Sequence, residues 1–86
     1  MRKIIFEQDA FEDFTTWAEI DKKVFKRLYK LIIETSREPF KGTGKPEPLK
    51  GNYKGCWSRR ITDEHRLIYR VSQNNLEIVS CRGHYE

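Results

Sequence analysis

Cysteine is scarce in this sequence, and long hydrophobic runs are missing from it. The two cysteines, Cys56 and Cys81, form no CxxC pair, so neither a disulfide scaffold nor a cysteine-based zinc site is indicated. The apolar run near the N-terminus, Ile4–Phe6, is far too short for a signal peptide or a membrane span. These shortages indicate a cytoplasmic protein with no membrane contact, in which both cysteines stay reduced.

The chain is also too short for two cores. Its 86 residues can bury one modest core, so we expect a single domain spanning residues 1–86. Hydrophobic residues make up 37% of the chain and aromatic residues 13%, enough apolar surface to offset the conformational entropy lost on folding. The carboxylates are scattered without the spacing of a metal site, and we expect neither a metal nor another cofactor.

Positive charge is concentrated in the middle of the chain. The formal net charge is +4, but residues 37–70 alone carry nine basic and four acidic side chains, an excess of +5. Residues 1–36 carry seven of each, and residues 71–86 carry one basic and two acidic side chains. A concentrated positive field suits a polyanionic partner, either nucleic acid or an acidic protein. A merely solvated basic surface would explain so small a net charge equally well.

The first half of the chain predicts one strand and two helices. Arg2–Phe6 is a short β-branched and aromatic run typical of a strand. Asp9, with Glu12 three residues later, has the pattern of a capping box that begins a first helix. Asp21 is placed to cap a second, amphipathic helix that should end near Arg37. A tight turn between the helices makes them antiparallel.

The second half predicts a loop and a meander of strands. Residues 39–55 hold all three prolines and four of the five glycines, which indicates a loop, with a brief strand at Leu49–Lys50. Three β-rich runs follow, separated by turn residues: Trp57–Thr62, His65–Ser72 and Leu76–Arg82. The fold class is therefore α+β, with an N-terminal strand, two antiparallel helices and an antiparallel meander. We expect the helices to pack on one sheet face and to leave the other free.

Alternation along the middle strand of the meander separates core from surface. Two sets of side chains point opposite ways, the core set being Leu67, Tyr69 and Val71 and the outward set Arg66, Ile68 and Arg70. The register with the preceding strand stays open, because a three-residue loop places Arg60 opposite Arg66 whereas a two-residue loop places Ile61 there. Only the first arrangement pairs two cations.

Three side chains have the chemistry that RNA cleavage by internal transfer requires. The reaction needs a base for the 2′-hydroxyl, a cation for the phosphorane-like transition state and an acid for the leaving 5′-oxygen. Glu47 is a carboxylate on a proline-stiffened loop, Arg66 offers a bidentate fork for phosphate, and His84 is of a type that titrates near neutral pH. Taken singly, a loop glutamate is more often solvated and a terminal histidine more often inert.

Specific motifs add a family resemblance that spans essentially the whole chain. They are the run G-K-P-E-P-L-K at Gly44–Lys50, the run W-S-R-R-I-T at Trp57–Thr62, and the ending Cys81–Tyr85. In these motifs the sequence resembles the YoeB/Txe toxins of type II toxin–antitoxin systems, in the RelE/ParE superfamily. The sequence departs from that family at Gly83, where an aromatic residue is expected, and at Glu86, which extends past the usual end.

The resemblance implies a RelE-like microbial RNase fold and an mRNA interferase, an endoribonuclease toxin that cleaves mRNA in the ribosomal A site without a metal. It implies Glu47 as general base, His84 as general acid and Arg66 as the phosphate-stabilising cation. Supporting contacts to RNA or the ribosome are implied for Lys45, Lys50, Arg59, Arg60 and Tyr85. It further implies neutralisation by a YefM/Axe-type antitoxin, with the monomer and the homodimer both open.

Two other readings compete with the nuclease. The same scaffold can serve as a non-catalytic, ParE-like inhibitor of DNA gyrase, whose basic face meets protein or DNA and which needs no trio of Glu47, Arg66 and His84. It can also serve as an inactive toxin that only binds an antitoxin. Gyrase inhibition without mRNA damage would favour the first, and the absence of growth arrest on expression would favour the second.

Overall fold

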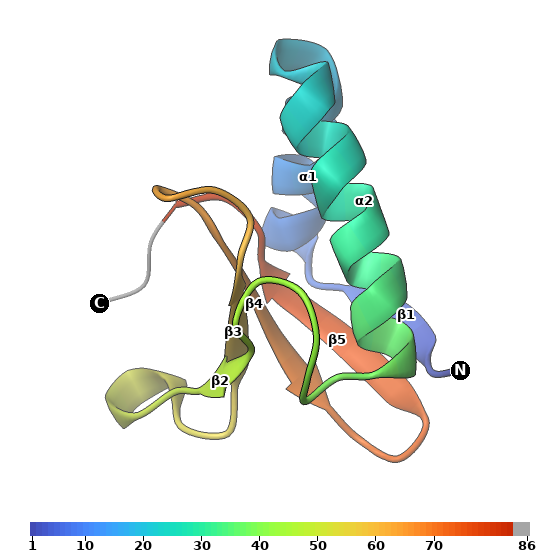
Figure 1. Ribbon diagram of the computed structural model, residues 1–86, viewed down its shortest axis with the longest axis vertical. Coiled ribbons are helices and arrows are strands. Elements are labelled where there is room, and N and C mark those ends of the chain that lie inside the picture. The colour runs from blue at the N-terminus through green and yellow to red at the C-terminus, as the bar shows by residue number, and fades with distance from the viewer. Residues whose placement is uncertain (84–86) are drawn as a thin grey trace.

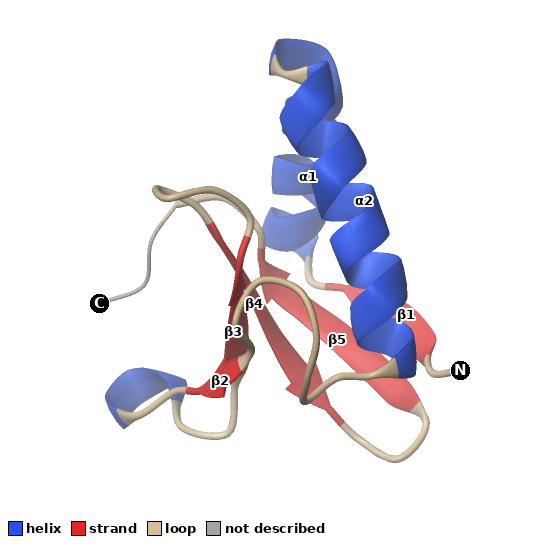
Figure 2. Cartoon of the chain, in the orientation of Figure 1, coloured by secondary structure: helices blue, strands red, loops and turns tan. Residues whose placement is uncertain are grey.

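The computed structural model describes residues 1–83, which fold into a helical hairpin standing on one face of a five-stranded sheet (Figures 1 and 2). The elements in chain order are β1 (Lys3–Phe6), α1 (Gln8–Ile20), α2 (Lys22–Arg37), β2 (Glu47–Pro48), a 3₁₀ turn (Gly51–Tyr53), β3 (Trp57–Arg60), β4 (Arg66–Val71) and β5 (Asn75–Ser80). The predicted α+β class and order of elements are confirmed.

The sheet is mixed because its first strand returns to the edge of the meander. The strand order is β1-β5-β4-β3-β2, in which β1 runs parallel to β5 and every other pair is antiparallel. The helical hairpin connects β1 to the rest of the chain, as a parallel pairing requires a long crossover. The three predicted meander strands are all present, each shorter than predicted.

The second helix begins and ends where the sequence predicts. The carboxylate of Asp21 accepts hydrogen bonds from the backbone N–H groups of Lys23 (3.2 Å) and Val24 (3.1 Å), two of the groups that a helix start leaves without partners. The helix ends at Arg37, and the N–H of Glu38 still bonds to the carbonyl of Glu34 at 2.8 Å. Pro39 follows and disfavours a further turn.

The predicted capping box at Asp9 is wrong. Helix α1 begins at Gln8, two residues earlier than a cap at Asp9 predicts, and Glu7 is its N-cap without a side-chain cap hydrogen bond. The N–H of Glu7 bonds to the carbonyl of Ile78 in β5 at 3.0 Å, and its carbonyl accepts from Phe11 at 2.9 Å. Pairing of β1 with β5 therefore fixes the residue at which the chain turns into the helix, and local capping chemistry does not decide it.

The main core lies between the helices and the sheet. Its buried members include the predicted pair Leu67 and Tyr69, and Val71 packs against them partly buried. Trp17 of α1 is inside this core, where its indole N–H donates to the carbonyl of Cys81 at 2.8 Å. The contact fixes the end of the last strand against the first helix.

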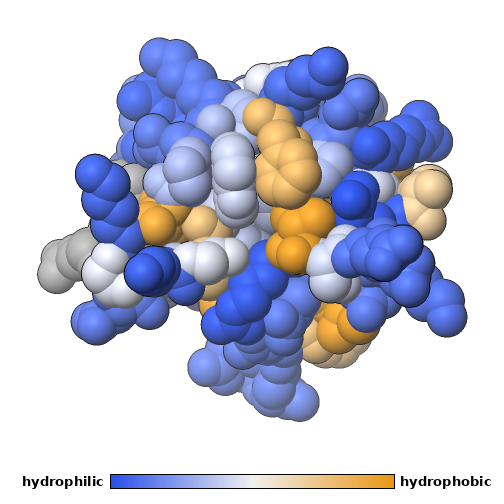
Figure 3. All heavy atoms as spheres, turned by 90° about the horizontal axis from the view of Figure 1, so that it is seen from below, coloured by the Kyte–Doolittle hydropathy of each residue, from blue (hydrophilic) through white to orange (hydrophobic). Residues whose placement is uncertain are grey.

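The opposite face of the sheet is not left free as predicted. Leu49, Cys56 and Ile68 form a second buried cluster there, with Tyr53 and Val79 packed against it. The loop after β2 thus folds back under the sheet, and Ile68 is core rather than surface. The brief strand is Glu47–Pro48 and not Leu49–Lys50, because Leu49 is needed in this second cluster. Seen from below, hydrophobic side chains form small areas among hydrophilic ones (Figure 3).

Candidate functional site

Glu47 lies on the edge strand of the sheet. It pairs with Ser58 of β3, and Pro48 pairs with Trp57. Proline is tolerated on an edge strand because it lacks only a donor that would otherwise face solvent. Lys45, just before this strand, has a φ of 53°, in the left-handed region that non-glycine residues rarely adopt. Both Glu47 and Lys45 are exposed, as is Lys50 beyond the strand.

The register of the sheet aligns Glu47 with the two cations that the sequence left unplaced. Arg60 is opposite Arg66, and the N–H of Ile61 bonds to the carbonyl of His65 at 2.9 Å. The loop that this pair closes, residues 62–64, is therefore the three-residue alternative. Ser58 is opposite Ile68, and Glu47 is opposite Ser58. Because residues directly opposite each other share a face and alternate residues return to it, Glu47, Arg60 and Arg66 all point away from the helices.

Arg66 is anchored through one end of its guanidinium group. Its Nη1 donates to the carbonyls of Thr62 (2.7 Å), Asp63 (3.1 Å) and His65 (3.2 Å), all in the turn that precedes β4. Within residues 1–83, no hydrogen bond occupies its Nε or Nη2. The anchored end fixes the direction of the side chain, and the other donors remain for a ligand such as a phosphate.

The end of the described chain is tied to the start of β4. The backbone N–H of Arg66 donates to the carbonyl of Gly83 at 2.9 Å, and the N–H of Gly83 donates to Nδ1 of His65 at 2.8 Å. The next residue in sequence is His84, which lies outside the described residues together with Tyr85. Their predicted roles stay predictions, but the chain enters His84 from a point beside Arg66.

Arg59 does not lie on the surface with the other cations that were predicted to contact RNA, and its predicted RNA role stays a prediction. Its side chain is fully buried on the helix side of the sheet and forms an ion pair with Glu34 of α2, Nη1 to Oε2, at 2.8 Å. It also donates to the carbonyls of Glu38, Lys41 and Thr43 and to the hydroxyl of Tyr69. Arg59 therefore holds the chain that leads from α2 to Glu47.

Glu34 completes this anchor from the helix side. Its Oε2 accepts from the N–H of Thr43 at 2.7 Å as well as from Arg59. These bonds, the one from the Thr43 N–H first, hold the pKa of the Glu34 carboxyl below its ordinary value. The loop is therefore closed onto α2 by an ionised carboxylate and a buried guanidinium.

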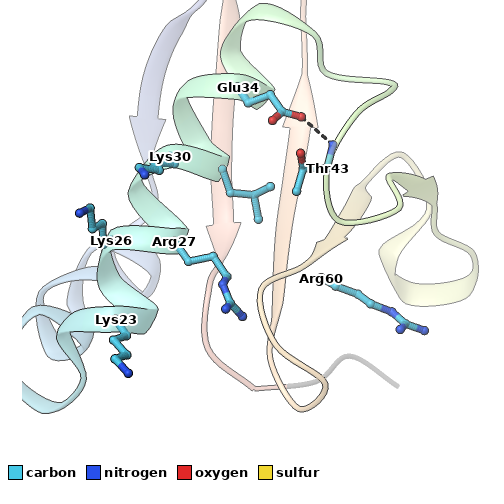
Figure 4. A pocket seen from close by; sticks show the side chains of 8 residues that line it. Lys23, Lys26, Arg27, Lys30, Glu34, Thr43 and Arg60 are labelled. Atoms are coloured by element: carbon cyan, nitrogen blue, oxygen red, sulfur yellow. Dashed lines mark hydrogen bonds between the residues drawn. The ribbon is translucent and has the colours of Figure 1, made fainter.

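A basic groove runs between α2 and this loop. A cavity of about 570 Å³ is lined by four cations of one helix face, Lys23, Lys26, Arg27 and Lys30, and by Arg60 of β3 (Figure 4). Among the described residues that line it, Glu34 is the single carboxylate. The side chain of Arg60 extends away from α2 (Figure 4). Arg60 thus both lines the groove and lies on the sheet face that carries Glu47 and Arg66.

The sequence did not predict two features of this site. In the sequence the cations of α2 have the pattern of a solvated helix face. They become one wall of a groove only when the loop and β3 fold against α2. His65 is not among the predicted site residues, because its place beside the site depends on a hydrogen bond with Gly83, eighteen residues away. No signal in the sequence marks either feature.

Among residues 1–83, no group of three or more histidine, cysteine, aspartate or glutamate side chains is placed to hold a metal ion. No helix within that stretch is both long and apolar enough to cross a membrane.

The architecture and the cation-rich face define the class as a small toxin of the YoeB/RelE kind. A solved YoeB/ParE toxin from Agrobacterium tumefaciens superposes with a TM-score of 0.91 at 44% sequence identity, over 96% of this chain and 99% of that one. Toxin YoeB of Escherichia coli K12 is 51% identical over 96% of this chain and 99% of its own length.

Two solved structures from Staphylococcus aureus are also similar, one of a YoeB–YefM complex (42% identity, TM-score 0.88, 99% of both chains) and one of a YoeB dimer (44%, 0.89, 98% of both chains). Residues 6–85 match the family of YoeB-like toxins of bacterial type II toxin–antitoxin systems. The chain belongs to this family.

Proposed function

We propose that the chain is a ribosome-dependent endoribonuclease that cleaves mRNA in the ribosomal A site without a metal. The observation that carries the proposal is the sheet register, which sets Glu47, Arg60 and Arg66 on one face. Two like charges directly opposite each other on neighbouring strands repel. A phosphate between Arg60 and Arg66 relieves that repulsion, so this pair of arginines is better suited to an anionic ligand than to an empty surface.

Glu47 is the general base in this proposal. It lies two strands away from Arg66 and two residues along the sheet from it, which by standard strand geometry is roughly 12 Å between Cα atoms. Two long side chains can reach one phosphodiester group across such a gap. The carboxylate takes the proton of the 2′-hydroxyl, and the 2′-oxygen attacks the adjacent phosphorus.

Arg66 and His84 complete the reaction. The Nε and Nη2 donors of Arg66 neutralise the charge that develops on the phosphoryl oxygens, a task for which a planar fork is well shaped. His84 protonates the 5′-oxygen as its bond to phosphorus breaks, which leaves a 2′,3′-cyclic phosphate on one fragment and a 5′-hydroxyl on the other. The tie between Gly83 and Arg66 supports this role, since it starts the terminal residues beside the phosphate site.

The basic groove of α2 is the surface along which the RNA or the ribosome is bound. Lys45, Lys50 and Arg60 are exposed cations around Glu47, and they supply the nearest contacts to phosphates. Tyr85 is the remaining predicted contact. Phosphate neutralisation by such residues gives affinity without sequence preference and makes binding sensitive to salt.

The partner that neutralises the toxin is an antitoxin of the YefM/Axe type. The solved YoeB–YefM complex from Staphylococcus aureus supports it, as does the excess of positive charge in residues 37–70. An acidic segment that folds on binding can cover such a surface. A homodimer of this chain is supported by the solved YoeB dimer from Staphylococcus aureus.

Controlled expression in a bacterial host tests the proposal. Wild type is expected to arrest growth and to fragment mRNA, while Glu47→Ala and His84→Ala fold normally and do neither. Glu19→Ala, which removes an exposed carboxylate from α1, is the matched control and should behave as wild type. Growth arrest with intact mRNA and inhibited gyrase would identify the ParE-like alternative. No arrest by wild type would identify a scaffold that only binds an antitoxin.

A further inference from the structure

His65 contacts two parts of the chain that are distant from it in sequence, and it also contacts its neighbour Arg66. Its imidazole ring packs edge-on against Trp17 of α1, with 4.8 Å between ring centroids and an angle of 82° between ring planes. Its Nδ1 accepts a hydrogen bond from the N–H of Gly83 at 2.8 Å. Its carbonyl accepts from Nη1 of Arg66 at 3.2 Å. One residue therefore contacts the first helix, the phosphate-site arginine and the terminal segment.

The hydrogen bond to Gly83 fixes the chemical state of the ring. An imidazole nitrogen accepts only when it carries no proton, so His65 holds its proton on Nε2 and is neutral in this arrangement. The edge-on packing against Trp17 sets the orientation of the ring, which keeps Nδ1 aimed at the terminal segment. Trp17 is itself held in place, because its indole N–H is bonded to the carbonyl of Cys81.

Each residue of the terminal segment 81–83 contacts another part of the fold. The N–H of Cys81 donates to Asp13 at 3.3 Å, and its thiol donates to the carbonyl of Ala10 at 3.4 Å. The guanidinium of Arg82 lies over the Trp17 ring, 5.7 Å from the centroid. Gly83 then bonds through its N–H to His65 and through its carbonyl to Arg66. Gly83 is the last residue of this series, and its N–H depends on His65 alone.

Gly83 also has a backbone conformation that needs support. Its φ of 92° lies in the region that glycine enters without steric cost and that it leaves as easily. A residue with so many accessible conformations loses much entropy when it is fixed. The hydrogen bonds of its N–H and its carbonyl select one conformation of Gly83. That conformation sets the direction in which the chain leaves Gly83.

We propose that His65 is a positioning residue for the terminal segment, acting through its Nδ1 on Gly83 to aim the predicted general acid at the phosphate held by Arg66. The proposal rests on the proposed nuclease function for its effect on rate, but the contact itself does not. His65 touches neither the RNA nor the reacting atoms. A misplacement of about 1 Å in a catalytic group costs on the order of 100-fold in rate. We therefore expect loss of this bond to lower mainly the rate of the cleavage step.

Two nearly isosteric substitutions test the contact. In His65→Asn the amide oxygen occupies about the place of Nδ1, since both atoms are bonded to Cγ, so it can accept from Gly83. In His65→Leu a methyl group stands there and cannot accept. Hydrogen exchange of the Gly83 amide, followed by NMR on the whole protein, is expected to accelerate in His65→Leu and to stay slow in His65→Asn. Equal protection in wild type and His65→Leu would overturn the proposal.

Single-turnover cleavage at saturating ribosomes tests the consequence. His65→Leu is expected to lose about 100-fold in the cleavage rate with little change in ribosome affinity, and His65→Asn to recover most of the loss. A His65→Leu enzyme that cleaves at the wild-type rate would contradict the positioning role. If wild type itself does not cleave, the proposed function fails, and the Gly83 exchange still decides whether the contact exists.

His65→Gln covers the case in which His65→Leu does not fold. Glutamine keeps a polar amide at this position but moves its oxygen one carbon further from the backbone. The variant is expected to fold, to expose the Gly83 amide to exchange and to cleave slowly. Wild-type exchange and rate in a folded His65→Gln protein would overturn the proposal.

Discussion

Replacement of Arg59 by leucine distinguishes a structural anchor from an RNA contact. The guanidinium group makes five hydrogen bonds, one of them to the carboxylate of Glu34 and three to backbone carbonyls. Arg59→Leu leaves those three carbonyls without their donor, at about 1 kcal/mol each. Because the Glu34 side chain is 38% exposed, water solvates it after the loss, and the ion pair adds only about 1 kcal/mol.

The expected destabilisation is therefore roughly 4 kcal/mol, within the range observed when one partner of a buried ion pair is removed. For a domain of this size a loss of 1 kcal/mol lowers Tm by roughly 4–8 °C, so Arg59→Leu should melt on the order of 15–30 °C below wild type. Differential scanning calorimetry measures the shift. Arg70→Leu is the matched control, because the Arg70 side chain is 50% exposed and its ion pairs with Glu7 and Glu77 are at the surface. Its Tm should change by only a few degrees.

An unchanged Tm for Arg59→Leu, together with lost RNA cleavage, would contradict the role of Arg59 as a structural anchor. It would mean that Arg59 contributes to RNA binding and not to the fold. Arg60→Leu gives the opposite expectation, because Arg60 is exposed on the face that carries Glu47. That variant should melt close to wild type and bind RNA more weakly, with a shallower dependence on salt.

Asp21, Glu34 and Cys81 each give an outcome that stability or labelling measurements can check. Asp21→Ala should lose about 1 kcal/mol of unfolding free energy in urea titrations, because two N–H groups of α2 lose their acceptor. The pKa of Glu34 is lowered on folding, so this carboxylate stabilises the protein above its ordinary pKa of 4.5, and the contribution disappears as the pH falls through the folded value. Glu34→Gln should therefore flatten the loss of stability at acid pH, measured by urea unfolding from pH 7 to pH 3. Burial raises the pKa of the Cys81 thiol to about 12, so alkylating reagents at pH 8 should label this cysteine only at the rate of unfolding.

The sequence predicts the elements of this fold better than the contacts between them. Asp21 was correctly assigned as a cap because capping is a local matter, decided by a carboxylate and two N–H groups within three residues. Asp9 carries the same signal and does not cap, because Glu7 is tied to Ile78 by a strand pairing that local patterns do not contain. Ile68 was placed at the surface by alternation, and it is buried because a loop folds under the sheet.

The arginines of β3 show the same limit at the site. Arg59 and Arg60 are neighbours on a strand, so one must point toward the helices and the other away. The sequence could not tell which, because the answer depends on the register with β4 and on Glu34, twenty-five residues from Arg59. Family resemblance assigned both to RNA, and only the packing separates them. The alignment of Glu47 with Arg66 likewise depends on two strand registers.

Primer extension on a defined mRNA, with and without purified ribosomes, shows whether the protein cleaves mRNA and whether cleavage depends on the ribosome. Wild type is expected to produce a stop within the A-site codon only when ribosomes are present, and the product should carry a 2′,3′-cyclic phosphate. Glu47→Gln, which keeps the size of the side chain and removes the base, should bind ribosomes and give no stop, while Glu19→Gln cleaves as wild type. Cleavage by a folded Glu47→Gln protein at the wild-type rate would contradict the account.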